Sequence, residues 1–118
     1  MDTCKVESIC QNVADAVAEV RRIFRSSFSV PEILDRYWAL QDNLSRLLEA
    51  ITDYPTAAME ALDGWPNLLK DVVDVLAFSS KLQSLKSIPA VREAGEAINN
   101  TLLEIQYLRQ ARVLTATA

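Results

Sequence analysis

The amino-acid sequence predicts an all-α fold, an antiparallel helical bundle of three long helices with additional short helices. Apolar residues recur at alternating spacings of three and four along most of the chain, which is the rhythm of amphipathic helices. The two glycines and four prolines are too few for the turns of a β-rich fold. Half of the 118 residues are apolar and 24% are charged, a mixture typical of a globular domain. We expect a single domain over residues 1–118, since this length is too short for two independent cores.

A first helix is expected over residues 3–25. Its apolar stripe follows the heptad spacing, with Val6, Cys10, Val13, Val17, Val20 and Phe24. Ile9, Ala16 and Ile23 widen the stripe to three positions per heptad, which favours packing against two neighbouring helices. Valine is only a middling helix former, so tertiary packing must stabilise this helix.

A second helix is expected over residues 31–54, and its start is the clearest in the chain. Ser29 can cap it, Pro31 fits the first turn, and Glu32 occupies the position that a capping box requires. Pro55 ends the helix or kinks it. Its stripe consists of Ile33, Tyr37, Leu40, Leu44, Leu47, Ile51 and Tyr54. Two pairs with the acid four residues before the base are expected to support it, Glu32–Arg36 and Asp42–Arg46.

Two elements are expected in the middle of the chain. A short helix over residues 56–63 would have Asp53 as its cap and Gly64 as its stop. The turn at Trp65 and Pro66 then leads into a third long helix, which continues to Leu85. A strand over residues 72–78 is the alternative, because β-branched residues are frequent there. We prefer the helix, since the helical spacing continues beyond this stretch.

The last helix is expected over residues 88–113. Ser87 followed by Pro89 repeats the arrangement of serine and proline that starts the second helix. The apolar stripe here is Val91, Ala94, Ile98, Leu102, Ile105 and Leu108. Gly95 inside the helix marks either a close helix crossing or simple tolerance, and the sequence leaves both open. Residues 114–118 are expected to form a frayed tail.

The charge balance argues against nucleic acid as a partner. The net charge is −4, and the one basic cluster, Arg21, Arg22 and Arg25, has Asp15 and Glu19 within helical reach. A solvated, paired face is therefore expected there, with no binding of nucleic acid. The apolar runs are too short to span a membrane, and the polar start of the chain does not resemble a signal peptide, so we expect no membrane association and a cytoplasmic location.

The residue types needed for most catalytic and metal sites are missing. The chain has no histidine, which excludes histidine-dependent triads and imidazole-containing metal sites. Two glycines cannot form a phosphate-binding loop. The acidic residues between Glu49 and Asp74 are interpreted as solvated surface. Cys4 and Cys10 lie six positions apart, a spacing that points them to different sides of one helix, so we expect a terminal thiol and a small core residue. No enzyme activity, cofactor or metal is expected.

Several large apolar residues fall outside the predicted core stripes and are candidates for binding a protein partner. Leu34 and Trp38 share one face of the second helix, Leu48 lies further along the same side, and Phe28 and Trp65 lie at helix ends. Tryptophan beside leucines at the edge of a core stripe is typical of helix-mediated interfaces. The alternative is that another helix covers them. Wide stripes on long helices also predict a homodimer.

In length, acidic balance, helical layout and lack of a catalytic motif, the chain resembles the small antiactivators that pseudomonads use against LuxR-type quorum-sensing transcription factors. This resemblance implies a regulator that occupies the dimerisation or DNA-binding surface of a transcription factor without touching DNA. Two alternatives remain open. One is a helical-bundle enzyme of the chorismate mutase type, for which suitable residue types are present in Arg21, Arg36, Arg46, Lys81 and Glu104. The other is a secretion chaperone or an immunity protein.

Overall fold

The computed structural model describes the backbone of residues 2–117 and the side chains of residues 3–82 and 84–111. All regular secondary structure in this range is helical, so the all-α prediction is confirmed. The helices are α1 (Asp2–Phe24), α2 (Val30–Asp53), α3 (Pro55–Asp63), α4 (Leu68–Ser80), α5 (Gln83–Lys86) and α6 (Pro89–Thr117). None of the described helices is long and apolar enough to cross a membrane.

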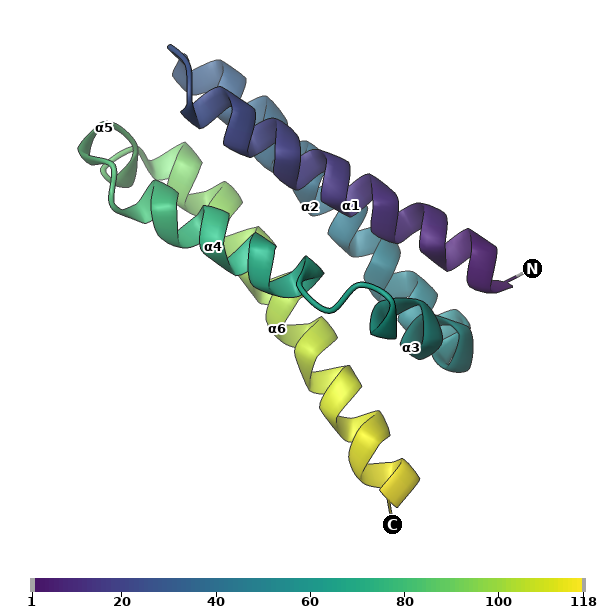
Figure 1. Cartoon of the computed structure of the whole chain (residues 1–118). Helices are drawn as coiled ribbons and strands as arrows, with labels where there is room; N and C mark the ends of the chain where they lie inside the picture. Colours follow the sequence, from purple (N-terminus) through teal and green to yellow (C-terminus); the bar gives the residue numbers. More distant parts are fainter. Residues whose placement is uncertain (1, 118) are drawn as a thin grey trace.

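The helices form an elongated bundle of 47 × 26 × 19 Å (Figure 1). The chain runs up α1 and returns down α2, and the short α3 turns it back into α4, which packs against α1. After α5 the chain reverses again into α6, which lies against α2 and runs in the same direction. Most of the contact between helices is made by α2, which packs against both α1 and α6.

The predicted apolar stripes form one continuous core. Every stripe residue of the first, second and last helices is buried except five that are partly buried, namely Ile9, Ala16, Phe24, Tyr54 and Leu108. Tyr37, Leu40, Leu44 and Ile98 are among the largest side chains with no exposed surface. Burying each side chain of this size contributes about 1.5–3 kcal/mol before the loss of conformational entropy. Tertiary packing thus stabilises even the valine-rich α1.

The start of α2 has the cap expected from the sequence. Ser29 is extended, with φ −107° and ψ 159°, and its Oγ accepts a hydrogen bond of 3.4 Å from the backbone N–H of Glu32. The prediction for the next helix is wrong in its cap, because Asp53 is the last residue of α2 and Tyr54 is the N-cap of α3. Pro55 cannot continue α2, so Tyr54 leaves the helical conformation. Tyr54 is both the C-cap of α2 and the N-cap of α3.

The third long helix ends earlier than predicted. It stops at Ser80, and residues 83–86 form the separate α5, although the helix chosen over a strand for residues 72–78 is confirmed. The hydroxyl of Ser80 donates a hydrogen bond of 2.9 Å to the backbone oxygen of Ala77, a local bond that competes with the helix. Leu82 is then extended, at φ −84° and ψ 118°, and turns the chain toward α6.

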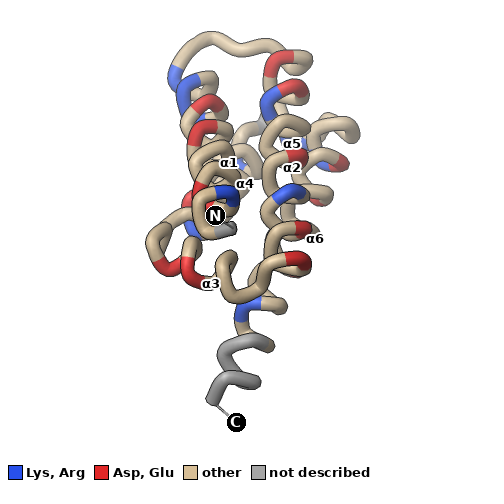
Figure 2. Tube along the Cα trace, turned by 90° about the vertical axis from the view of Figure 1, so that its right-hand side faces the viewer, with Lys and Arg blue, Asp and Glu red and all other residues tan. Residues whose placement is uncertain are grey.

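The surface ion pairs differ from those expected. Arg22 pairs with Glu19 at 2.8 Å as predicted, but Arg36 pairs with Asp35 at 3.1 Å and not with Glu32. Arg21 reaches across to Asp71 of α4 at 3.3 Å. Acidic and basic residues are interspersed along the helices in Figure 2, without a continuous basic face. The tail expected at 114–118 lies outside the residues whose side chains are described, while the α6 backbone is helical to Thr117.

Candidate binding surfaces

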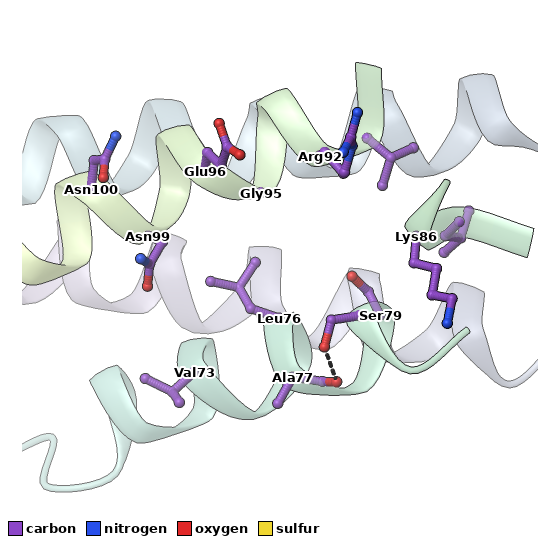
Figure 3. Close-up of a pocket in the computed structure, with 13 residues that line it drawn as sticks. Val73, Leu76, Ala77, Ser79, Lys86, Arg92, Gly95, Glu96, Asn99 and Asn100 are labelled. Atoms are coloured by element: carbon purple, nitrogen blue, oxygen red, sulfur yellow. Dashed lines mark hydrogen bonds between the residues drawn. The ribbon is translucent and has the colours of Figure 1, made fainter. Parts of the chain in front are cut away.

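A groove of about 560 Å³ runs between α4 and α6 and is closed at one end by α5 (Figure 3). Its walls are mainly apolar or small side chains, and the polar groups lie along the α6 rim and at the ends. The lining residues are Val73, Leu76, Ala77, Ser79, Ser80, Leu85, Lys86, Val91, Arg92, Gly95, Glu96, Asn99 and Asn100. This volume lies in the range of small-molecule sites, which often form between the helices of a bundle.

The groove exists because the residues that face it are small. A Cβ added to Gly95 would have nothing within 4 Å, so the close helix crossing considered for this glycine is excluded. Ala77 and Ser80 of α4 are equally unable to fill the space. The opposite flank of α6 is different, because Gln41 Nε2 of α2 donates a hydrogen bond of 2.9 Å to Thr101 Oγ1 and ties the two helices together.

The charged groups of the groove are unevenly distributed. Lys86 and Arg92 lie toward the α5 end, while Glu96 and the two asparagines, Asn99 and Asn100, follow along α6 (Figure 3). The lining therefore holds two cations and one acid, although the chain as a whole has a net charge of −4. The charged ends of Lys86 and Arg92 point in opposite directions in Figure 3, so they do not converge on one point of the groove.

Aromatic side chains gather where α1 and α4 end. The ring of Phe24 lies 5.6 Å from that of Phe28 and 5.2 Å from that of Phe78. Arg21 and Arg25 flank a second hollow here, of about 290 Å³. The edge-to-face arrangement of Phe24 and Phe28 is a favourable packing geometry, so Phe28 contributes to the stability of this end of the bundle.

The five residues expected to bind a partner are spread along the molecule. Trp38 is 43% exposed, whereas the other four are partly buried and pack against the core. Phe28 lies in the connection between α1 and α2 and Trp65 in that between α3 and α4, at opposite ends of the bundle (Figure 1). Leu34 and Leu48 lie near opposite ends of α2. The structure therefore does not gather the five into one patch.

Two exposed apolar residues on α6 were not found from the sequence. Leu103 is 54% exposed and Tyr107 is 69% exposed, and they are one helical turn apart. Thr101 of α6 faces α2 through its hydrogen bond with Gln41, whereas Leu103 lies four and three residues after Asn99 and Asn100, on the side of α6 that lines the groove with α4. We call Trp38, Leu103 and Tyr107 the α2–α6 surface. The sequence could have indicated this exposure, because Leu103 and Tyr107 lie on the side of the last helix opposite its predicted apolar stripe.

The buried side chains of Cys10 and Tyr37 have raised pKa values. Burial, with a smaller contribution from Glu7, raises the pKa of the Cys10 thiol from 9.0 to about 11, while Cys4 is exposed. The prediction of a core cysteine and a terminal thiol is confirmed. Burial also raises the pKa of Tyr37. Ser79 is the polar neighbour that partly offsets this shift, although no hydrogen bond of normal geometry joins the two hydroxyls. Both groups stabilise the core in their neutral forms.

The residues with possible mutase chemistry lie on different surfaces. Arg36 and Arg46 line a hollow between α1 and α2 together with Asp15 and Glu19, whereas Arg21 pairs with Asp71 between α1 and α4. Lys81 follows the end of α4 and Glu104 is exposed on α6. Among the described residues, no three cysteines or carboxylates come together in a way that could hold a metal ion.

Comparison with protein-family models, with curated proteins and with solved structures finds no match for this chain. The functional interpretation therefore rests on the surfaces described above.

Proposed function

We propose that this chain is a non-enzymatic regulatory protein that binds and sequesters a protein partner through the α2–α6 surface. The observation that carries the proposal is the exposure of three large apolar side chains, Trp38 on α2 and Leu103 and Tyr107 on α6. Tryptophan and tyrosine are the residues most enriched among binding hot spots, because they bury a large area at low entropic cost. Their exposure leaves apolar area that binding would remove from water.

The partner that we propose is a transcription factor of the quorum-sensing type, as the resemblance to antiactivators implies. The negative net charge supports a role in which the chain blocks a regulator without binding DNA itself. A homodimer is also part of the proposal, and a second copy that covered Leu103 and Tyr107 would compete with the partner for these residues. A secretion effector or a toxin as the recovered partner would instead favour the chaperone or immunity alternative.

The test is affinity purification of the tagged protein from its native host, followed by mass spectrometry with quantified stoichiometry. The partner identified there is then titrated against Trp38→Ala and Tyr107→Ala. We expect each variant to weaken binding by roughly 30-fold, equivalent to about 2 kcal/mol, because each removes an aromatic anchor.

Phe78→Ala provides the matched control. Phe78 is 49% exposed, close to the value for Trp38, but it lies at the aromatic end of α1 and α4. It should leave the affinity for the partner unchanged, and all three variants should keep the circular dichroism spectrum of the wild type. Wild-type affinity in both Trp38→Ala and Tyr107→Ala would contradict the proposed surface.

A further inference from the structure

We propose that the partner of this chain presents a basic amphipathic helix to the outer side of α6. The proposal rests on the proposed function, because it names the chemistry of the partner at the α6 part of the α2–α6 surface. It is carried by the spacing, the exposure and the charge of the side chains along α6.

A row of exposed side chains runs along α6 on the side turned away from the core. The row, which we call the α6 outer row, consists of Glu93, Glu96, Asn100, Leu103, Glu104 and Tyr107. Its members follow the heptad spacings of three and four, so all six fall within a sector of about 100° around the helix. The row is about 21 Å long at the rise of an α-helix. This is the spacing with which a helix packs lengthwise against a second helix.

The charged residues of the α6 outer row are all acidic. No lysine or arginine lies between Glu93 and Tyr107, and the nearest bases in the sequence are Arg92 and Arg109. Among the described residues, none of the three glutamates of the row takes part in an ion pair. Glu93 and Glu96 stand three residues apart, a like-charge pair that mildly destabilises a helix. Lysine or arginine side chains of a partner would relieve this repulsion and form opposite-charge pairs.

The apolar residues of the row lie in its second half. Leu103 is 54% exposed and Tyr107 is 69% exposed, one helical turn apart, whereas Glu93 and Glu96 occupy the first half. Burial of the apolar pair would contribute most of the affinity, and the glutamates would select the charge of the partner. The partner helix therefore carries apolar side chains against the second half of the row and basic side chains against the first.

A second copy of this chain fits the α6 outer row less well than a basic helix. In an antiparallel pair of α6 helices, the glutamates of one copy would meet the apolar half of the other and lose water without gaining a partner. In a parallel pair, glutamates would meet glutamates, and like charges repel. The charges of the row thus favour a partner of a different sequence.

Two synthetic helical peptides of three heptads are the probes for this surface. Both have leucine at the first and fourth positions of each heptad, and the flanking positions are lysine in one peptide and glutamate in the other. Each peptide is labelled, used below the concentration at which it self-associates, and titrated with the full chain by fluorescence anisotropy at low ionic strength. We expect the lysine peptide to bind about tenfold more tightly, since each exposed ion pair contributes about 1.5- to 5-fold. The preference should shrink in high salt, which screens exposed charges.

The acidic part of the row is tested by a triple variant, Glu93→Gln, Glu96→Gln and Glu104→Gln. It should bind the two peptides with affinities within about twofold of each other, because the ion pairs are removed. The matched control makes the same change in net charge at exposed residues of α1, α2 and α3, with Glu7→Gln, Glu32→Gln and Glu60→Gln. The control should keep the preference for the lysine peptide, and both variants should keep the circular dichroism spectrum of the wild type.

The apolar part of the row is tested by Leu103→Ala with Tyr107→Ala. This variant should bind the lysine peptide at least tenfold more weakly than the wild type, because it loses the two apolar contacts. Unchanged binding would show that the peptide is held elsewhere and would overturn the proposal. Light scattering on the same samples addresses a second copy. A wild-type dimer that becomes a monomer in this variant would assign the row to self-association and would also overturn the proposal.

Equal affinity of the wild type for the two peptides, or a lysine preference that survives in the triple variant, would contradict a basic partner. The partner recovered by affinity purification separates this failure from a failure of the proposed function. If Trp38→Ala weakens binding of that partner and the triple variant does not, the α2–α6 surface stands and the basic helix is wrong. If both variants weaken it, and the triple variant also reduces the salt dependence of binding, both proposals are supported.

Discussion

The two flanks of α6 differ in how completely they are closed. Toward α2, the buried stripe and the Gln41–Thr101 hydrogen bond join the two helices. Toward α4, Gly95 and small residues of the facing helix leave the groove of about 560 Å³. One helix thus takes part in a closed seam and an open one, and the difference depends on side-chain size at a few positions. The closed seam stabilises the fold, and the open one is available for binding.

Substitutions in the core and on the α2–α6 surface should differ most in their effect on the free energy of unfolding. Leu44→Ala removes a side chain with no exposed surface and should lower the free energy of unfolding by about 2–5 kcal/mol. Leu103→Ala changes a residue that is mostly exposed and should alter it by less than about 0.5 kcal/mol. Urea denaturation of both variants measures the two values. A large loss for Leu103→Ala, dependent on protein concentration, would show that a second copy covers this surface.

A second prediction uses the buried thiol of Cys10 in α1. Its pKa is 9.0 in ordinary surroundings and about 11 in the folded chain, so between these values the unfolded state binds fewer protons than the folded state. Stability is therefore full below pH 9 and falls as the pH rises toward 11, by an amount on the order of 2 kcal/mol. Unfolding of the wild type and of Cys10→Ala is compared from pH 8 to pH 11. The difference between them should shrink as the pH rises, and a constant difference would show that the thiol titrates normally.

The smallest expected change in the free energy of unfolding concerns Gly95, at the groove between α4 and α6. Gly95→Ala should raise the free energy of unfolding by about 0.5–1 kcal/mol, because alanine favours the helix and its Cβ meets no neighbour. Gly64→Ala is the control, since a Cβ there would lie 3.3 Å from the backbone oxygen of Ala61. Thermal unfolding should show a higher melting temperature for the first variant and a smaller gain, or none, for the second. A loss of stability in Gly95→Ala would mean that the seam between α4 and α6 is tighter than the groove requires.

The elements and the core could be predicted from the sequence, because helical periodicity is a local property. The stripes of α1, α2 and α6 and the Ser29 cap depend on residues a few positions apart, and the structure confirms them. The errors came where local signals compete. Ser80 and Leu82 end α4 early by a side-chain hydrogen bond and an extended residue, and a helical pattern that continued to Leu85 concealed this break.

The candidate sites were less accessible to sequence reasoning. Trp38 was identified from its position beside the core stripe, but the exposure of Leu103 and Tyr107 depends on which helices pack against α6. Gly95 was recognised as unusual, and only the structure showed that it faces open space. What the sequence by itself determined is therefore the helical class, the buried face of each long helix and the absence of histidine chemistry. The tertiary structure decided which seams close and which large apolar residues stay exposed, because these depend on contacts between residues far apart in the chain.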